Sequence, residues 1–152
     1  MVAHALILES PTTQHSKKID VAAQQDSACV CRQIELTIFH HYLDIYSFLE
    51  HASFDVIVLD ITQIPNEDRA GYLCRVNGLY PIMPFILIGQ HSDDQFALAM
   101  IECGVQQFLV EESLTPDNLQ RAIRHAAARN ALTQKLASQL LIREREQEIG
   151  ML

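Results

Sequence analysis

Acidic residues stand directly after several short apolar runs of this sequence. Glu9 follows the first run, Asp60 the third, and Glu111 the fifth. If these runs are parallel strands, their carboxyl ends meet at one edge of a sheet, where such sheets bind ligands. Carboxylates within about 4–6 Å of one another disfavour ionisation, so they raise a pKa or recruit a cation or water. The sequence therefore predicts a site built on these three acids, with no cation among them.

A second candidate group combines thiols and imidazoles. Cys29 and Cys31 precede His40 and His41, and both side-chain types are zinc ligands. The Cys-x-Cys spacing is shorter than the usual spacing of zinc ligands, so buried thiols and histidines at a helix start are the more ordinary interpretation. Cys74 lies in an expected helix, where burial is the default. A thiol or zinc sensor remains an alternative.

Five apolar runs must position these residues, and they alternate with longer amphipathic segments. This pattern is typical of strands that helices bury on both faces. The runs are residues 3–8, 34–39, 54–59, 84–88 and 106–110. With crossover helices between them, they predict an α/β fold with a doubly wound, five-stranded parallel sheet.

Capping residues mark the expected helices. Ser92 precedes an acidic first turn and Gly104 ends that helix, while Thr115 and Pro116 begin another. No proline or glycine follows Pro116 until near residue 148, which predicts a last helix of about 30 residues and about 45 Å. We divide the chain into a domain over residues 1–130 and a C-terminal helical extension or linker over residues 131–152.

The extension repeats leucine at four-residue steps, at Leu132, Leu136 and Leu140, before a mixed charged segment over residues 143–146. Only about two heptads are present, fewer than a persuasive coiled coil contains. A dimerising helix and a solvated linker are both compatible with this pattern.

Composition and charge exclude several classes of function. The 152 residues are 49% hydrophobic, enough for one domain with a packed core. The net charge of −8 has the wrong sign for binding the phosphate backbone of nucleic acid. No stretch approaches the roughly 18 apolar residues of a membrane span, so we expect a cytoplasmic protein with reduced cysteines and no membrane partner. The seven histidines show no Ser–His–Asp arrangement, so nucleophilic hydrolysis is not indicated.

The chain resembles response-regulator receiver domains over about residues 4–130. The resemblance rests on FDVIVLD, which ends at Asp60, on PFILIGQHSDDQFALAMIECGVQQFLV, and on TPDNLQRAIRHAAARNAL. It implies a flavodoxin-like sheet of strand order 2-1-3-4-5 with helices on both faces. It also implies that Asp60 accepts a phosphoryl group from a histidine kinase, with Mg²⁺ held by Glu9 and Asp60.

Three positions depart from the receiver pattern. Ser10 stands where receivers have a metal-binding acid, Gly89 where they have a Thr or Ser hydroxyl, and Glu111 where they have a Lys. The lost ligand charge predicts weak Mg²⁺ binding, and the glycine leaves no side chain to switch. The resemblance therefore indicates a degenerate, atypical receiver with no cofactor beyond weakly bound Mg²⁺.

We predict a signalling module that is not an enzyme and acts by protein–protein interaction or dimerisation. The expected partners are a second copy and a histidine kinase or output-domain protein. By analogy, the C-terminal helix would join the receiver to an output domain such as a cyclic-di-GMP enzyme or a histidine kinase. Expected interface residues on the fourth and fifth helices are Phe96, Met100, Arg121 and Arg124. The alternative is a working phosphorelay receiver modified at Asp60.

Overall fold

Five parallel strands form one sheet in the computed structural model, which describes residues 2–12, 15, 34–101 and 104–150, with side chains through residue 146. The strands are β1 (Ala3–Leu8), β2 (Ile34–Phe39), β3 (Val56–Asp60), β4 (Phe85–Gly89) and β5 (Val105–Val110). Their order, β2-β1-β3-β4-β5, confirms the predicted doubly wound sheet. β3 and β4 begin later than predicted and have Asp60 and Gly89 as their last residues.

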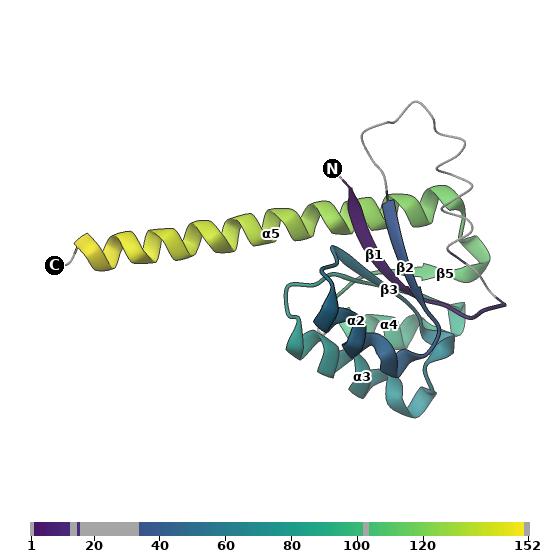
Figure 1. Cartoon of the computed structure of the whole chain (residues 1–152). Coiled ribbons are helices and arrows are strands. Elements are labelled where there is room, and N and C mark those ends of the chain that lie inside the picture. The colour runs from purple at the N-terminus through teal and green to yellow at the C-terminus, as the bar shows by residue number, and fades with distance from the viewer. Residues whose placement is uncertain (1, 13–14, 16–33, 102–103, 151–152) are drawn as a thin grey trace.

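Helices cover both faces of the sheet (Figure 1). One face packs against α2 (Ile45–His51), α3 (Asn66–Leu79) and α4 (Asp94–Met100), and the other packs against α5 (Pro116–Gly150). Successive strand residues alternate between the two faces. Leu6 and Leu8 therefore join the core under the three helices, whereas Ala5 and Ile7 join the core under α5.

Short 3₁₀ turns follow the carboxyl ends of three strands and shape that edge of the sheet. They are η2 (Ile61–Gln63) after β3, η3 (His91–Asp93) after β4, and η5 (Glu111–Ser113) after β5. A further turn, η1 (Tyr42–Asp44), leads into α2.

The predicted start signal is confirmed for α5 but is wrong for α4. Ser92 lies within η3, where Gln90 and Asp93 form the capping box, and α4 begins only at Asp94. The Thr115 hydroxyl accepts a hydrogen bond from the Asn118 backbone N–H at 3.1 Å, which confirms the N-cap before Pro116. α4 ends at Met100. Gly104 then has a φ of 86°, in the left-handed region that favours glycine, as the chain enters β5.

The last helix extends far beyond the sheet, as predicted. α5 has 35 residues, which corresponds to about 52 Å. Asn130 is its last buried residue and donates from Nδ2 to the Asp55 carbonyl at 3.0 Å. From residue 131 to residue 146 the side chains are exposed, apart from half-buried Ala137. The division of the chain after residue 130 stays a prediction. We call residues 131–150 the arm and residues 1–130 the body (Figure 1).

Candidate functional site

Asp60 is buried at the end of β3, with 1% of its surface exposed. Its Oδ1 accepts two hydrogen bonds from Thr62, one from the backbone N–H at 3.0 Å and one from the hydroxyl at 2.6 Å. Its Oδ2 accepts a hydrogen bond from His15 Nε2 at 3.0 Å. Both carboxylate oxygens are therefore engaged by neighbouring side chains and backbone.

These contacts fix the ionisation of the carboxyl group. Burial raises the pKa of Asp60, but the hydrogen bonds from His15 and Thr62 outweigh burial and hold that pKa below its ordinary value. Asp60 is therefore a carboxylate at neutral pH, stabilised by groups within its own chain.

The pairing of His15 with Asp60 places a basic side chain beside an acid for which the sequence predicted no neighbouring cation. His15 is itself buried, and its other ring nitrogen, Nδ1, has no hydrogen-bond partner among the residues that the structure describes. A second basic group lies beside β4, where Arg69 Nη1 is 3.5 Å from Asp93 Oδ1. Arg69 also donates from Nε to the Ile64 carbonyl at 3.0 Å, which ties the start of α3 to the chain after Asp60.

Glu9 lies next to Asp60 along the edge of the sheet. Leu8 pairs with Leu59, so Glu9 follows β1 at the level where Asp60 ends β3. Glu9 is buried, and its backbone carbonyl accepts a hydrogen bond from His40 Nδ1 at 2.8 Å. The structure thus places these two predicted acids at the carboxyl ends of two adjacent strands, β1 and β3.

Ser10 and Glu111 occupy different surroundings from Asp60. The Ser10 hydroxyl is 2.8 Å from the Thr12 hydroxyl and accepts from the Thr12 backbone N–H at 3.2 Å, so it closes a local turn. Glu111 is half-buried at the start of η5, following β5. Because β4 lies between β3 and β5, β3, which ends at Asp60, and β5, which Glu111 follows, are about 10 Å apart.

Gly89 is glycine for a packing reason. A Cβ atom at this position would lie 2.9 Å from Asp93 Oδ2, 2.9 Å from Ile61 Cδ1 and 3.0 Å from Phe108 Cε2. Ile61, directly after Asp60, is fully buried. The space that a hydroxyl side chain needs at residue 89 is therefore already filled.

The Mg²⁺ ion implied by the resemblance does not fit these residues. Asp60 offers no exposed oxygen, because Thr62 and His15 occupy its two oxygens. Ser10, at the position of the second acid, is turned toward Thr12. Within the described ranges, no group of three or more His, Cys, Asp or Glu side chains is arranged to hold a metal ion.

The alternative thiol and zinc site is only partly within the described residues. Cys29 and Cys31 lie outside them. His40 bonds to the Glu9 carbonyl, and His41 accepts from the Leu43 backbone N–H at 3.3 Å as the cap of η1. Cys74 is exposed on α3, contrary to the expected burial.

The α4 surface differs from the predicted interface. Met100 is buried in the core with 9% exposed and Phe96 is half-buried, because this side of α4 faces the sheet. Among the described residues of this segment, the large apolar side chains that are exposed are Leu98 and Ile101. Arg121 is exposed and Arg124 half-buried on α5, and their interface role remains a prediction.

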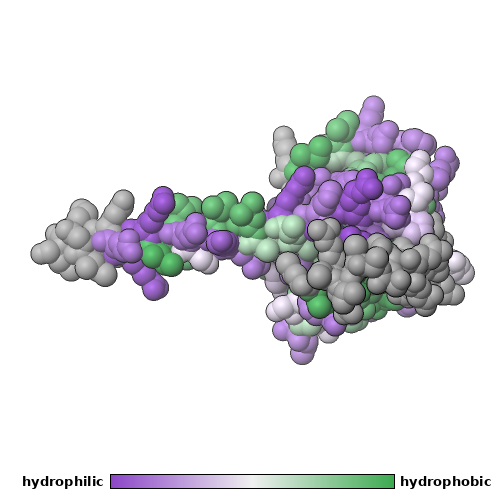
Figure 2. Space-filling view, turned by 90° about the horizontal axis from the view of Figure 1, so that it is seen from above, coloured by the Kyte–Doolittle hydropathy of each residue, from purple (hydrophilic) through white to green (hydrophobic). Residues whose placement is uncertain are grey.

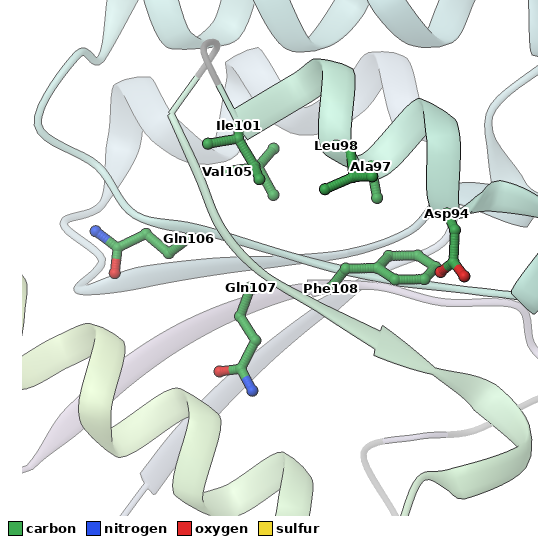
Figure 3. Close-up of a pocket in the computed structure, with 8 residues that line it drawn as sticks. All are labelled: Asp94, Ala97, Leu98, Ile101, Val105, Gln106, Gln107 and Phe108. Atoms are coloured by element: carbon green, nitrogen blue, oxygen red, sulfur yellow. The ribbon is translucent and has the colours of Figure 1, made fainter.

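Leu98 and Ile101 line a shallow groove of about 270 Å³ between α4 and β5 (Figure 3). Its lining consists of Asp94, Ala97, Leu98, Ile101, Val105, Gln106, Gln107 and Phe108. The groove is mainly apolar, and among the described residues that line it only Asp94 is charged.

Sequence reasoning missed both partners of Asp60. The Thr62 contact had a recognisable signal, because an Asp often accepts from the backbone N–H two residues later. His15 is 45 residues from Asp60 in the sequence, and nothing in its neighbourhood marks it as a partner.

Comparisons with known proteins identify the fold. Neither protein-family models nor curated proteins match the sequence. Among solved structures, a response regulator receiver domain protein from Clostridium thermocellum is similar with a TM-score of 0.67 and 21% identity, over 86% of this chain and 98% of the other. The fold is thus that of response-regulator receiver domains.

Two further similar structures belong to differently named proteins. An adenylate cyclase from Rhodopirellula baltica gives a TM-score of 0.74 at 13% identity, covering 92% of this chain and 98% of that chain. NtrX from Brucella abortus gives 0.72 at 15% identity, covering 90% of this chain but only 30% of the longer NtrX chain. At such identities the likeness concerns the fold.

Proposed function

We propose that this chain is an atypical receiver module that regulates an attached or partner output domain through protein contacts, without phosphoryl transfer to Asp60. The observation that carries the proposal is the closure of Asp60 by His15 and Thr62. A carboxylate nucleophile needs an accessible oxygen and a cation to neutralise the incoming phosphoryl group. Among the residues that the structure describes, Asp60 is buried and its basic partner His15 already occupies Oδ2.

The departures at Ser10, Gly89 and Glu111 support the same proposal. Each replaces a group that receivers use on the metal or the phosphoryl oxygens, and Gly89 is held by the packing of Ile61 and Phe108. We include self-association, absence of catalysis and a cytoplasmic location in the proposal. None of the helices in the described residues is long and apolar enough to cross a membrane.

A phospho-accepting receiver is the second candidate. It is favoured by the position of Asp60 at the end of β3 and by the lowered pKa of its carboxyl, since a nucleophilic carboxylate must be ionised. In this candidate, His15 would have to leave Oδ2 before phosphorylation. A histidine kinase would be the donor.

A phosphoryl mimic separates the two candidates. We expect no saturable change in the amide resonances of residues 60–63 when the wild-type chain is titrated with beryllofluoride at millimolar Mg²⁺. The Asp60→Asn variant is the matched control. A saturable response of the wild type that Asp60→Asn abolishes would overturn the first candidate and establish the second.

The His15→Ala variant identifies what blocks the carboxylate. A response in this variant alone would assign the block to the imidazole on Oδ2. No response in either protein would assign it to the missing partners at Ser10, Gly89 and Glu111.

A further inference from the structure

The arm carries a line of exposed leucines. Leu132, Leu136 and Leu140 are 58%, 51% and 60% exposed. Figure 2 shows apolar side chains gathered along the helix where it projects from the body. Steps of three or four residues keep side chains on neighbouring positions of one side of a helix, so these leucines form a continuous stripe. Leu141, also exposed, lies beside its distal end, whereas exposed Ile142 points to the other side of the helix.

Residues of opposite charge lie at the two ends of this stripe. Arg129 lies three residues before Leu132, and Glu144 lies four residues after Leu140, so both continue the same side of the helix. Arg129 and Glu144 are both exposed. The Arg129 guanidinium donates a long hydrogen bond of 3.5 Å to the Gln106 side-chain oxygen.

The net charge of the chain is confined to the body. Residues 131–152 contain three basic and three acidic residues, so the whole net charge of −8 belongs to residues 1–130. Two copies therefore repel one another at their bodies but not along their arms. A parallel arrangement would place the two bodies side by side, whereas an antiparallel one places them at opposite ends of the paired arms.

We propose that a second copy of this chain binds the leucine stripe with the two arms antiparallel. In this arrangement Arg129 of one protomer faces Glu144 of the partner subunit at both ends of the stripe. A parallel arrangement would instead align Arg129 with Arg129 and Glu144 with Glu144, which is unfavourable. The inference rests on the self-association included in the proposed function and names its surface and direction.

Light scattering on the full chain tests the surface. We expect the mass of a dimer at tens of micromolar, and the mass of a monomer for Leu136→Asp. Leu98→Asp is the matched control, since Leu98 is 67% exposed but lies on α4, and this variant should remain a dimer. A wild-type monomer would overturn self-association, and a dimeric Leu136→Asp would overturn the arm as its surface. Neither outcome changes the result of the beryllofluoride titration. Failure of the proposed dimer surface can therefore be distinguished from failure of the proposed function.

Charge reversal tests the direction. Arg129→Glu and Glu144→Arg should each weaken the dimer by about tenfold, since each converts two exposed ion pairs into repulsions. The double variant should restore wild-type affinity, because it exchanges the two charges. In a parallel dimer each single reversal replaces one like-charge pair by another. Unchanged affinity in both single variants would therefore overturn the antiparallel arrangement.

Discussion

Replacement of Gly89 by alanine is expected to lower the free energy of unfolding by about 1–3 kcal/mol. The new Cβ would lie within 3.0 Å of atoms of Asp93, Ile61 and Phe108. Ile61 is fully buried, and Asp93 is held by Arg69 and by the Gln90 backbone N–H, so neither of these two side chains can move away without losing contacts. Urea unfolding measures the difference.

Gly71→Ala is the matched control for this substitution. A Cβ at Gly71, within α3, meets nothing within 4 Å, so alanine should raise the free energy of unfolding by about 0.5–1 kcal/mol through helix propensity. Adding Ile61→Val to Gly89→Ala removes the Cδ1 contact and should recover part of the loss. Equal effects of alanine at Gly89 and Gly71 would contradict the packing explanation.

The packing at Gly89 bears on function as well as stability. A hydroxyl at this position is what a receiver uses to sense a phosphoryl group, and a threonine here would bring more atoms into the same filled space. Restoring the hydroxyl therefore requires changes at Ile61 or Phe108 too. The departure from the receiver pattern at Gly89 therefore involves the packing of its neighbours Ile61 and Phe108 as well as residue 89 itself.

The sheet was predictable because its strands are buried on both faces. β1, β3 and β4 need apolar side chains at nearly every position, and that requirement is visible as runs in the sequence. Thr115 and Pro116 likewise mark the start of α5 by local chemistry. Strand order came from the resemblance, since local patterns carry no information on which strands are neighbours.

The contacts of the site were less predictable because they join distant segments. Asp60 was identified from its position after an apolar run, but its His15 contact depends on how the chain after β1 returns to β3. The orientation of α4 was misjudged for a related reason. Apolar residues occur on both of its sides, and only the packed structure separates buried Met100 from exposed Leu98.

The second large effect concerns the hydrogen bonds that stabilise the Asp60 carboxylate. Asp60→Asn should lower the free energy of unfolding at neutral pH by about 1–3 kcal/mol, because an amide accepts weaker hydrogen bonds from His15 and Thr62 than a carboxylate does. Glu50→Gln, which changes an exposed acid on α2, should alter it by less than about 0.5 kcal/mol.

The pH dependence of the effect of Asp60→Asn on the free energy of unfolding shows whether the ionised carboxyl group of Asp60 is responsible. The pKa of Asp60 in the folded chain is lower than the unfolded value of about 3.9. Between these two values the unfolded chain binds more protons, so the stability contributed by Asp60 is present above about pH 4 and is lost as the pH falls through the folded pKa. Urea unfolding should therefore show that the difference in the free energy of unfolding between the wild type and Asp60→Asn becomes smaller as the pH is lowered below 4. A difference that stays constant from neutral pH to this range would mean that His15 and Thr62 do not stabilise the charged form, and the closed carboxylate on which the proposed function depends would lose its physical basis.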